Sequence, residues 1–79
     1  MKMITIDTEK TGKRIQQMCR EKGLTVSFIQ RELCFKSPQA VYRWFSCKTI
    51  PSIDSLVLLA NLLDCHIEDL LAYKVIDSS

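Results

Sequence analysis

Apolar residues recur at helical spacing along the chain, and capping residues, glycine and proline separate the recurring segments. The first segment predicts a helix that begins at Asp7 or Thr8 and ends before Gly23. Its inward face would hold Ile15, Met18 and Cys19. The next segment predicts a helix of about nine residues capped by Thr25. Its buried stripe would be Val26, Ile29 and Leu33, and a turn of Cys34, Phe35 and Lys36 would follow.

The third segment has a distinct start signal and two contrasting faces. Ser37 is an expected N-cap, and Pro38 would take the first helical position, where its missing N–H costs nothing. The apolar spacing turns Val41, Trp44 and Phe45 inward. The opposite, outward face carries Gln39, Tyr42, Arg43 and Ser46.

The last two helical segments are the most apolar. Ser52 is an expected cap, with Asp54 in the first turn, and the core face would comprise Ile53, Leu56, Leu59, Ala60 and Leu63. Further apolar residues widen that face, which suits a helix at the centre of the core or one against a second chain: Val57, Leu58 and Leu62. A short fifth helix follows His66, a surface or capping residue, and buries Ile67, Leu70 and Leu71.

The two ends of the chain have a different pattern. Residues 4–6 and 73–76 alternate or are β-branched, so they could pair as a two-stranded ribbon or pack on a partner. Frayed tails with incidental apolar residues are the simpler alternative. We therefore expect one all-α, five-helix domain over residues 1–79, with its core in 8–72 and with peripheral, β-like segments at 1–6 and 73–79.

Composition narrows the class, and the charge distribution suggests a partner. Hydrophobic residues make up 47% and charged residues 25%, as in globular proteins, and no apolar run is long enough to span a membrane. The segment from Lys10 to Lys48 has nine basic and two acidic residues, a net +7, whereas residues 49–79 have one basic and five acidic residues. The basic segment favours a polyanionic partner, although an accidentally clustered, solvated surface gives the same count.

Four cysteines, at spacings of 15, 13 and 18 residues, match no zinc or redox motif. We expect reduced thiols in a cytoplasmic protein that needs no metal or cofactor. The chain also lacks a carboxylate pair, a nucleophile–base pair and a glycine-rich phosphate loop. A binding function is therefore expected, and an enzyme is not.

Two short helices joined by a three-residue turn, the second anchored by a bulky apolar residue, define a helix-turn-helix. The outward face of its second helix enters the DNA major groove. Glutamine can pair with adenine and arginine with guanine, so the expected base contacts are Gln39, Arg43 and Tyr42. The helix N-termini and nearby basic residues would contact phosphates through Thr25, Ser27, Lys36, Ser37 and Lys48.

The residues that support this interpretation resemble a known family. The runs are Gly23-Leu24-Thr25, residues 37–44 (SPQAVYRW), and residues 48–54 (KTIPSID). Together they are similar to phage-repressor-type regulators, the Cro and lambda-repressor-like or XRE-like proteins. This resemblance covers residues 8–72. It implies a compact five-helix domain that binds operator DNA, often as a dimer, with residues 37–45 as the recognition helix.

The sequence departs from the family pattern at several positions. Cys34 and Cys47 stand where glycine is usual, and in a left-handed conformation each would cost about 1 kcal/mol. Cys19 and Phe45 replace the arginine and the acid that often form an ion pair, a joint loss that is tolerable. Val26 replaces a glutamine, which removes an expected phosphate contact.

Three functions remain open from the sequence. The favoured one is a sequence-specific regulator, acting as a repressor and dimeric at least on DNA. The alternatives are the antitoxin or accessory half of a two-protein system, and a protein-interaction module that has lost DNA binding. The spare apolar surface for a dimer or protein partner would be Val57, Leu58, Leu62, Tyr73, Val75 and Ile76.

Overall fold

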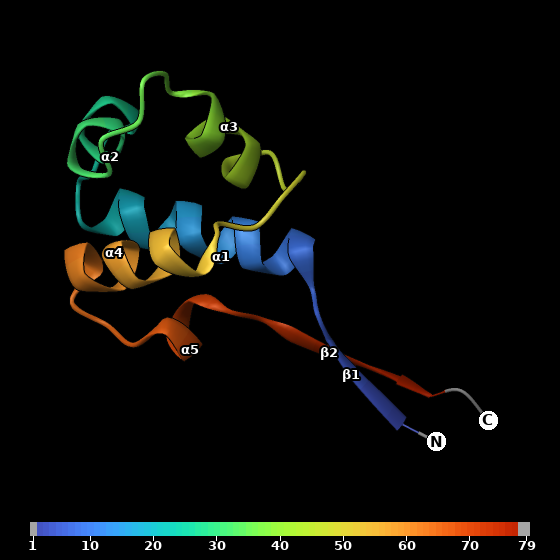
Figure 1. The fold of residues 1–79 in the computed structure, drawn as a ribbon. Coiled ribbons are helices and arrows are strands. Elements are labelled where there is room, and N and C mark those ends of the chain that lie inside the picture. The colour runs from blue at the N-terminus through green and yellow to red at the C-terminus, as the bar shows by residue number, and fades with distance from the viewer. Residues whose placement is uncertain (1, 78–79) are drawn as a thin grey trace.

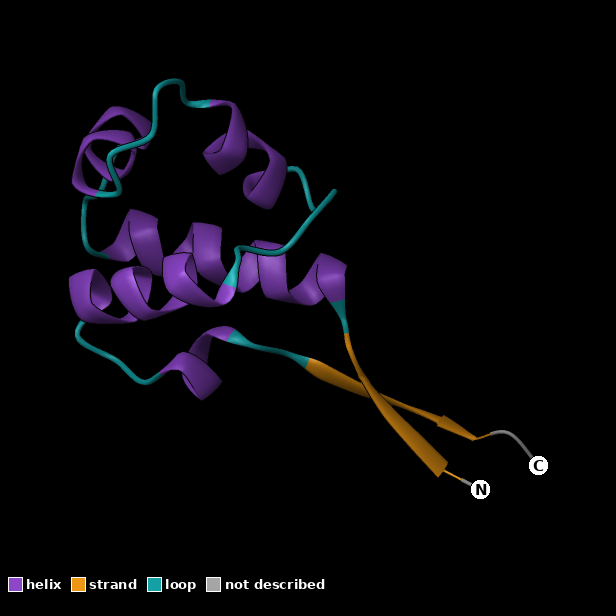
Figure 2. Ribbon diagram, viewed as in Figure 1, coloured by secondary structure: helices purple, strands orange, loops and turns teal. Residues whose placement is uncertain are grey.

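A computed structural model describes residues 2–77 of the protein (Figure 1). These residues form a helical body from which a two-stranded ribbon extends, and the principal extents are 45 × 23 × 20 Å (Figure 2). Residues 1 and 78–79 of the predicted peripheral segments lie outside the described range. The elements in chain order are β1 (Lys2–Ile6), α1 (Thr8–Glu21), α2 (Val26–Glu32), α3 (Gln39–Phe45), α4 (Ile53–Leu63), α5 (Ile67–Leu70) and β2 (Tyr73–Asp77).

Three of the predicted helix caps are confirmed. The Asp7 carboxylate accepts a hydrogen bond from the backbone N–H of Lys10 at 3.0 Å. The Thr25 hydroxyl accepts from the N–H of Phe28 at 3.1 Å, and Ser52 does the same for the N–H of Ser55 at 3.2 Å. Each side chain thus satisfies one amide that the first helical turn leaves without a partner.

The predicted start of the third helix was wrong by one residue. Pro38, not Ser37, is the N-cap of α3, and the helix has no side-chain cap. Pro38 has φ −81° and ψ 1°, and its carbonyl already accepts the N–H of Tyr42 at 3.1 Å, so the first turn closes behind the proline. The second helix is also shorter than expected, with seven residues in α2.

The core lies where the apolar periodicity predicted it. Its central side chains are fully or almost fully buried: Ile15, Cys19, Ile29, Leu33, Val41, Trp44, Leu56, Leu59, Ala60, Leu63 and Leu70. Helix α3 packs on α1 and α2, whereas α5 packs on α4 and α1. In Figure 1, α2 and α3 therefore lie on one side of α1, and α5 lies on the other.

Two assignments on α4 need correction. Ile53 was expected in the core but is 76% exposed; it is the first residue of the helix, where the chain enters from the loop. Ser55 is buried instead, and its hydroxyl accepts a hydrogen bond from Ser52 at 3.1 Å. Leu62 was expected on the spare apolar surface but is partly buried and packs against the core.

The ends of the chain form the ribbon, one of the three possibilities left open by the sequence. Strands β1 and β2 pair antiparallel over all five residues of each strand. The ribbon is fastened to the body at its base, where the N–H of Asp7 donates to the carbonyl of Ala72 at 2.8 Å. The buried hydroxyl of Thr11 accepts the N–H of Ala72 at 3.0 Å, and Arg14 donates to the carbonyl of Leu71 at 2.8 Å.

Candidate nucleic-acid interface

Helices α2 and α3 and the turn between them form a rigid unit. The turn begins with Cys34 in the left-handed region at φ 58°, and its backbone closes when the N–H of Phe35 donates to the carbonyl of Gln30 at 3.0 Å. The Gln30 side chain donates back to the carbonyl of Phe35 at 3.3 Å. The Phe35 ring then meets Trp44 edge to face, with 5.7 Å between the ring centroids. This stack fastens the turn to α3, an anchor that the sequence interpretation had left as a plain turn residue.

The inward face of α3 fixes the direction in which its outward face points. Val41 is fully buried and Trp44 is 4% exposed. Phe45 is half-buried and packs against the core. All four residues predicted for the opposite face are exposed: Gln39, Tyr42, Arg43 and Ser46. The side chains that hold α3 in the core are therefore separate from those that face solvent and could contact a ligand.

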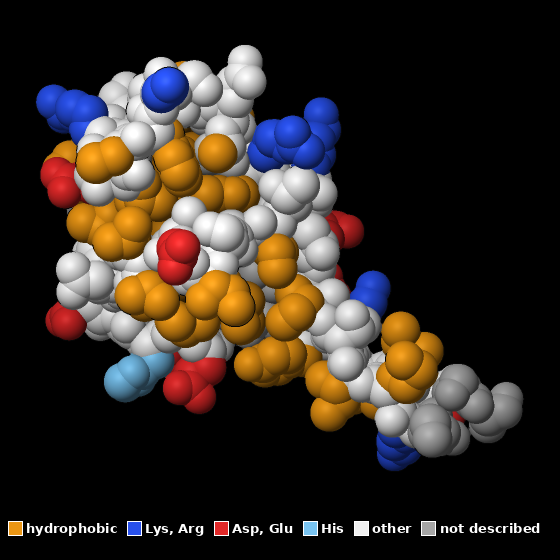
Figure 3. Space-filling model, in the orientation of Figure 1, with side chains coloured by type: hydrophobic (Ala, Val, Ile, Leu, Met, Phe, Trp, Pro, Cys, Tyr) orange, Lys and Arg blue, Asp and Glu red, His pale blue; other side chains and the backbone are white. Residues whose placement is uncertain are grey.

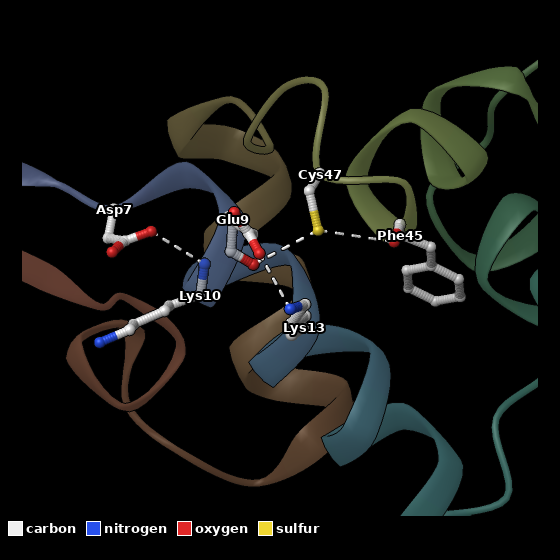
Figure 4. Close-up of polar contacts among 6 residues, drawn as sticks. All are labelled: Asp7, Glu9, Lys10, Lys13, Phe45 and Cys47. Atoms are coloured by element: carbon white, nitrogen blue, oxygen red, sulfur yellow. Dashed lines mark hydrogen bonds and ion pairs between the residues drawn. The ribbon is translucent and has the colours of Figure 1, made fainter.

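The loop after α3 is tied to the start of α1 (Figure 4). Cys47 has φ 65°, and its thiol donates to the carbonyl oxygen of Glu9 at 3.3 Å. Here α1 lies so close to the end of α3 that a Cβ on Gly12 would be 2.5 Å from the carbonyl oxygen of Trp44. Glycine is therefore required at position 12 by close packing, a requirement that the local sequence did not indicate.

A groove runs between the second half of α1, the start of α2 and the outward face of α3. It has a volume of about 760 Å³. Its lining includes the three predicted base-contact residues and two of the predicted phosphate-contact residues: Gln39, Tyr42, Arg43, Thr25 and Lys48. The remaining three predicted phosphate-contact residues are exposed on α2 and in the turn and do not line the groove: Ser27, Lys36 and Ser37.

The floor of the groove is apolar. It contains Cys19 and Phe45, the two residues that replace the ion pair common in the resembling family, together with Leu24 and Val26. Burial raises the pKa of the Cys19 thiol to about 11, so this thiol is neutral at physiological pH and acts as an apolar filler. Two polar residues of α1, Gln16 and Arg20, also line the groove, and the sequence interpretation had missed both.

The charge around the groove is positive and not neutralised by neighbouring acids. Three of the lining residues are basic (Arg20, Arg43 and Lys48), and none of the lining residues is acidic. Within residues 2–77 the one ion pair joins Lys13 to Glu9 at 2.9 Å, at the far end of α1 (Figure 4). That contact raises the pKa of Lys13, chiefly through the hydrogen bond to Glu9. The bases beside α3 thus remain available to an anionic partner.

All four cysteines are free thiols. Residues 2–77 contain no cluster of three or more metal-ligating side chains. In the same range, no helix combines the length and the apolar character needed to cross a membrane.

Two short helices set around a fixed turn, with an exposed polar face on the second beside a basic groove, define a helix-turn-helix DNA-binding domain. A family model described as "Helix-turn-helix" matches residues 15–70. The protein therefore belongs to the helix-turn-helix family of DNA-binding regulators.

Among solved structures, the fold is similar to that of the restriction-modification controller protein C.AhdI from Aeromonas hydrophila. The TM-score is 0.71 at 22% sequence identity, over 81% of this chain and 96% of the controller protein. Among curated proteins, no relative matches the sequence.

Proposed function

We propose that the protein is a transcriptional repressor that binds double-stranded operator DNA by placing α3 in the major groove. The observation that carries this proposal is the division of α3 into a buried anchor, Val41 and Trp44, and an exposed polar face beside a basic groove. The similarity of the fold to a controller protein supports a regulatory role. The function is binding, not catalysis, and we place the protein in the cytoplasm with the DNA it regulates.

The proposed base contacts are Gln39, Tyr42 and Arg43. Gln39 is the first residue of α3, and Arg43 follows one turn later on the same exposed side. Glutamine offers a donor and an acceptor that match N6 and N7 of adenine, and the arginine fork matches O6 and N7 of guanine. Tyr42, which is 56% exposed, can contact a thymine methyl or a phosphate.

The proposed phosphate contacts surround this helix. Thr25 caps the start of α2, where amide groups and the positive end of the helix dipole favour a phosphate. Lys48 follows α3, is exposed and lines the groove. Three exposed residues would complete the set of phosphate contacts: Ser27, Lys36 and Ser37.

The regulator would act on DNA as a homodimer. One helix of seven residues contacts only a few base pairs, and that is too little sequence to distinguish an operator from a genome of competing sites. Two copies related by a twofold axis would read two half-sites about one helical turn apart.

One observation favours a second candidate function. The apolar floor of the groove, with Val26 where the resembling family has glutamine, would also suit a protein partner. The protein would then be the antitoxin or accessory half of a two-protein system, or an interaction module without DNA binding. An electrophoretic mobility shift assay with random duplex at low salt distinguishes the interaction module from the other candidates, because a module without DNA binding would not retard the duplex.

Selection of bound duplexes from a random pool tests the proposed function. We expect enrichment of a palindromic consensus with an A·T pair and a G·C pair at fixed positions in each half-site. The Trp44→Ala protein is the negative control, because loss of a buried aromatic anchor should unfold the reading unit. A pool that shows no enrichment after repeated rounds, although the protein is folded by circular dichroism, would contradict the proposal.

A further inference from the structure

The β1–β2 ribbon is an addition to the domain that the family model describes. The model matches residues 15–70, whereas the two strands occupy residues 2–6 and 73–77. The ribbon projects from the body on the side away from α2 and α3 (Figure 1). A lone two-stranded ribbon is at best marginally stable in water. Packing of its exposed apolar side chains on another surface would stabilise it.

The register of the two strands separates their side chains into two unlike faces. Side chains alternate along each strand, and directly opposed residues point to the same side. One face, here named the apolar ribbon face, carries Ile4 opposite Val75 and Ile6 opposite Tyr73, with Lys2 opposite Asp77 at its tip. The other face pairs Met3 with Ile76 and Thr5 with Lys74.

The apolar ribbon face is largely in contact with solvent. Ile4 is 73% exposed, Val75 61% and Tyr73 55%. Figure 3 shows that hydrophobic side chains continue from the ribbon as a band across the lower part of the body, over the region of α4. Exposed apolar residues of α4 are Ile53, Val57 and Leu58. A contiguous exposed band of this kind is typical of a surface that another molecule covers.

We propose that the apolar ribbon face packs against the same face of a second copy of the chain, about a twofold axis that runs along the ribbon. This operation places β1 of one chain over β2 of the other. Ile4 then faces Val75 of the second copy, and Lys2 lies beside Asp77 of the second copy. The surface is therefore self-complementary, since apolar groups meet apolar groups and opposite charges meet at the tip.

The apolar ribbon face alone is too small for a stable dimer. A specific interface buries at least about 1,200 Å² in total, and four side chains per chain cannot supply that area. Further apolar surface over the region of α4 is visible in the same view as the ribbon, and a stable dimer would bury part of it as well (Figure 3). The arrangement leaves the outward face of α3 uncovered, because α3 and the ribbon lie at opposite sides of the body (Figure 1).

The dimer is tested without DNA, so the result is independent of the proposed function on which its biological role rests. Sedimentation velocity of the full chain should show a dimer at tens of micromolar. Ile4→Asp and Val75→Lys should each raise the dimer dissociation constant by at least about tenfold, because each buries a charge opposite an apolar partner. Matched controls on the other face of the same strands, Met3→Asp and Ile76→Lys, should change it by less than about threefold.

Mixing the two interface variants tests the strand placement itself. In the mixed dimer the introduced carboxylate faces the introduced ammonium across the axis, so the mixture should recover dimers that neither variant forms alone. Circular dichroism of each variant excludes unfolding as the cause. A monomeric wild-type chain, equal losses on both faces, or a mixture that stays monomeric would overturn the inference.

A duplex-binding assay on the same samples separates the two proposals. If the variants behave as expected but the wild-type dimer binds no duplex, the proposed function fails and the ribbon interface stands. If the wild-type protein binds a palindromic duplex but its ribbon variants still dimerise, the ribbon inference fails and the proposed function stands.

Discussion

Cys34 and Cys47 occupy backbone positions that favour glycine, yet their surroundings differ. Both have positive φ, 58° and 65° respectively. The Cys34 side chain is exposed, whereas the half-buried Cys47 thiol donates to the carbonyl of Glu9 and lies where a Cβ on Gly12 would be 3.0 Å away. A left-handed conformation therefore costs each cysteine free energy, and the Cys47 thiol gains a hydrogen bond that offsets part of this cost.

The first prediction is that the two cysteines respond differently to replacement by glycine. Cys34→Gly should raise the free energy of unfolding by up to about 1 kcal/mol, because glycine adopts positive φ without the Cβ penalty. Cys47→Gly should raise the free energy of unfolding by a smaller amount or lower it, because this change also removes the thiol contact with Glu9. Urea denaturation followed by circular dichroism measures both. A lower midpoint for Cys34→Gly than for wild type would show that the turn requires its side chain.

At the scale of elements, α3 separates the groups that hold the helix from the groups that would read DNA. Gln39→Ala should weaken binding to the preferred operator by about 1–3 kcal/mol and relax selectivity at one A·T position. Arg43→Ala should do the same at a G·C position. Neither change should alter the fold, since both side chains are exposed. Fluorescence anisotropy with operator and random duplexes provides the comparison.

Two outcomes of that comparison would contradict the proposed contacts. A uniform loss on all duplexes for Arg43→Ala would assign this residue to a phosphate instead of a base. Operator binding that survives both substitutions would mean that α3 is not the reading element, and the proposed mechanism would be lost.

Local patterns were sufficient to predict most of the elements. Helical spacing of apolar residues and the caps Asp7, Thr25 and Ser52 placed three of the helix starts, because these signals act within one or two turns. The start of α3 was misplaced because both Ser37 and Pro38 are compatible with a cap, and only the closed turn behind the proline distinguishes them.

The groove could be predicted only in part, because it depends on tertiary packing. The outward residues of α3 follow from the position of Trp44 within one helix. In contrast, Gln16 and Arg20 reach the groove from α1, and the Phe35 ring meets Trp44 from the turn. Contacts between separate elements leave no periodic signal in a single sequence.

The charge of the whole molecule is divided between its first and last segments. The segment from Lys10 to Lys48 carries a net +7, and residues 49–79 carry a net −4. When the basic residues of the first segment bind a polyanion, they release its counterions, and this release adds a binding free energy that depends on salt. The uneven charge distribution should therefore be measurable as a salt dependence of the affinity for duplex DNA.

We predict that affinity for duplex DNA falls with salt with a slope of about −0.9 per phosphate contact. Lys36→Ala and Lys48→Ala should each reduce the magnitude of that slope by about one, because each removes one phosphate contact. Lys74→Ala is the matched control: this residue is also exposed, but it lies on β2 and should leave the slope unchanged. Affinity that does not change with salt would exclude the basic segment as the source of binding.

The position of Trp44 makes the reading unit visible to optical spectroscopy. It is the one tryptophan of the chain, 4% exposed and in edge-to-face contact with Phe35. Its emission therefore reports on the seating of α3 against the turn, while the ribbon and α5 contribute no indole signal. A red shift of that emission would mark detachment of α3 during unfolding, and comparison with the far-ultraviolet helix signal would show whether the reading unit detaches before the rest of the body.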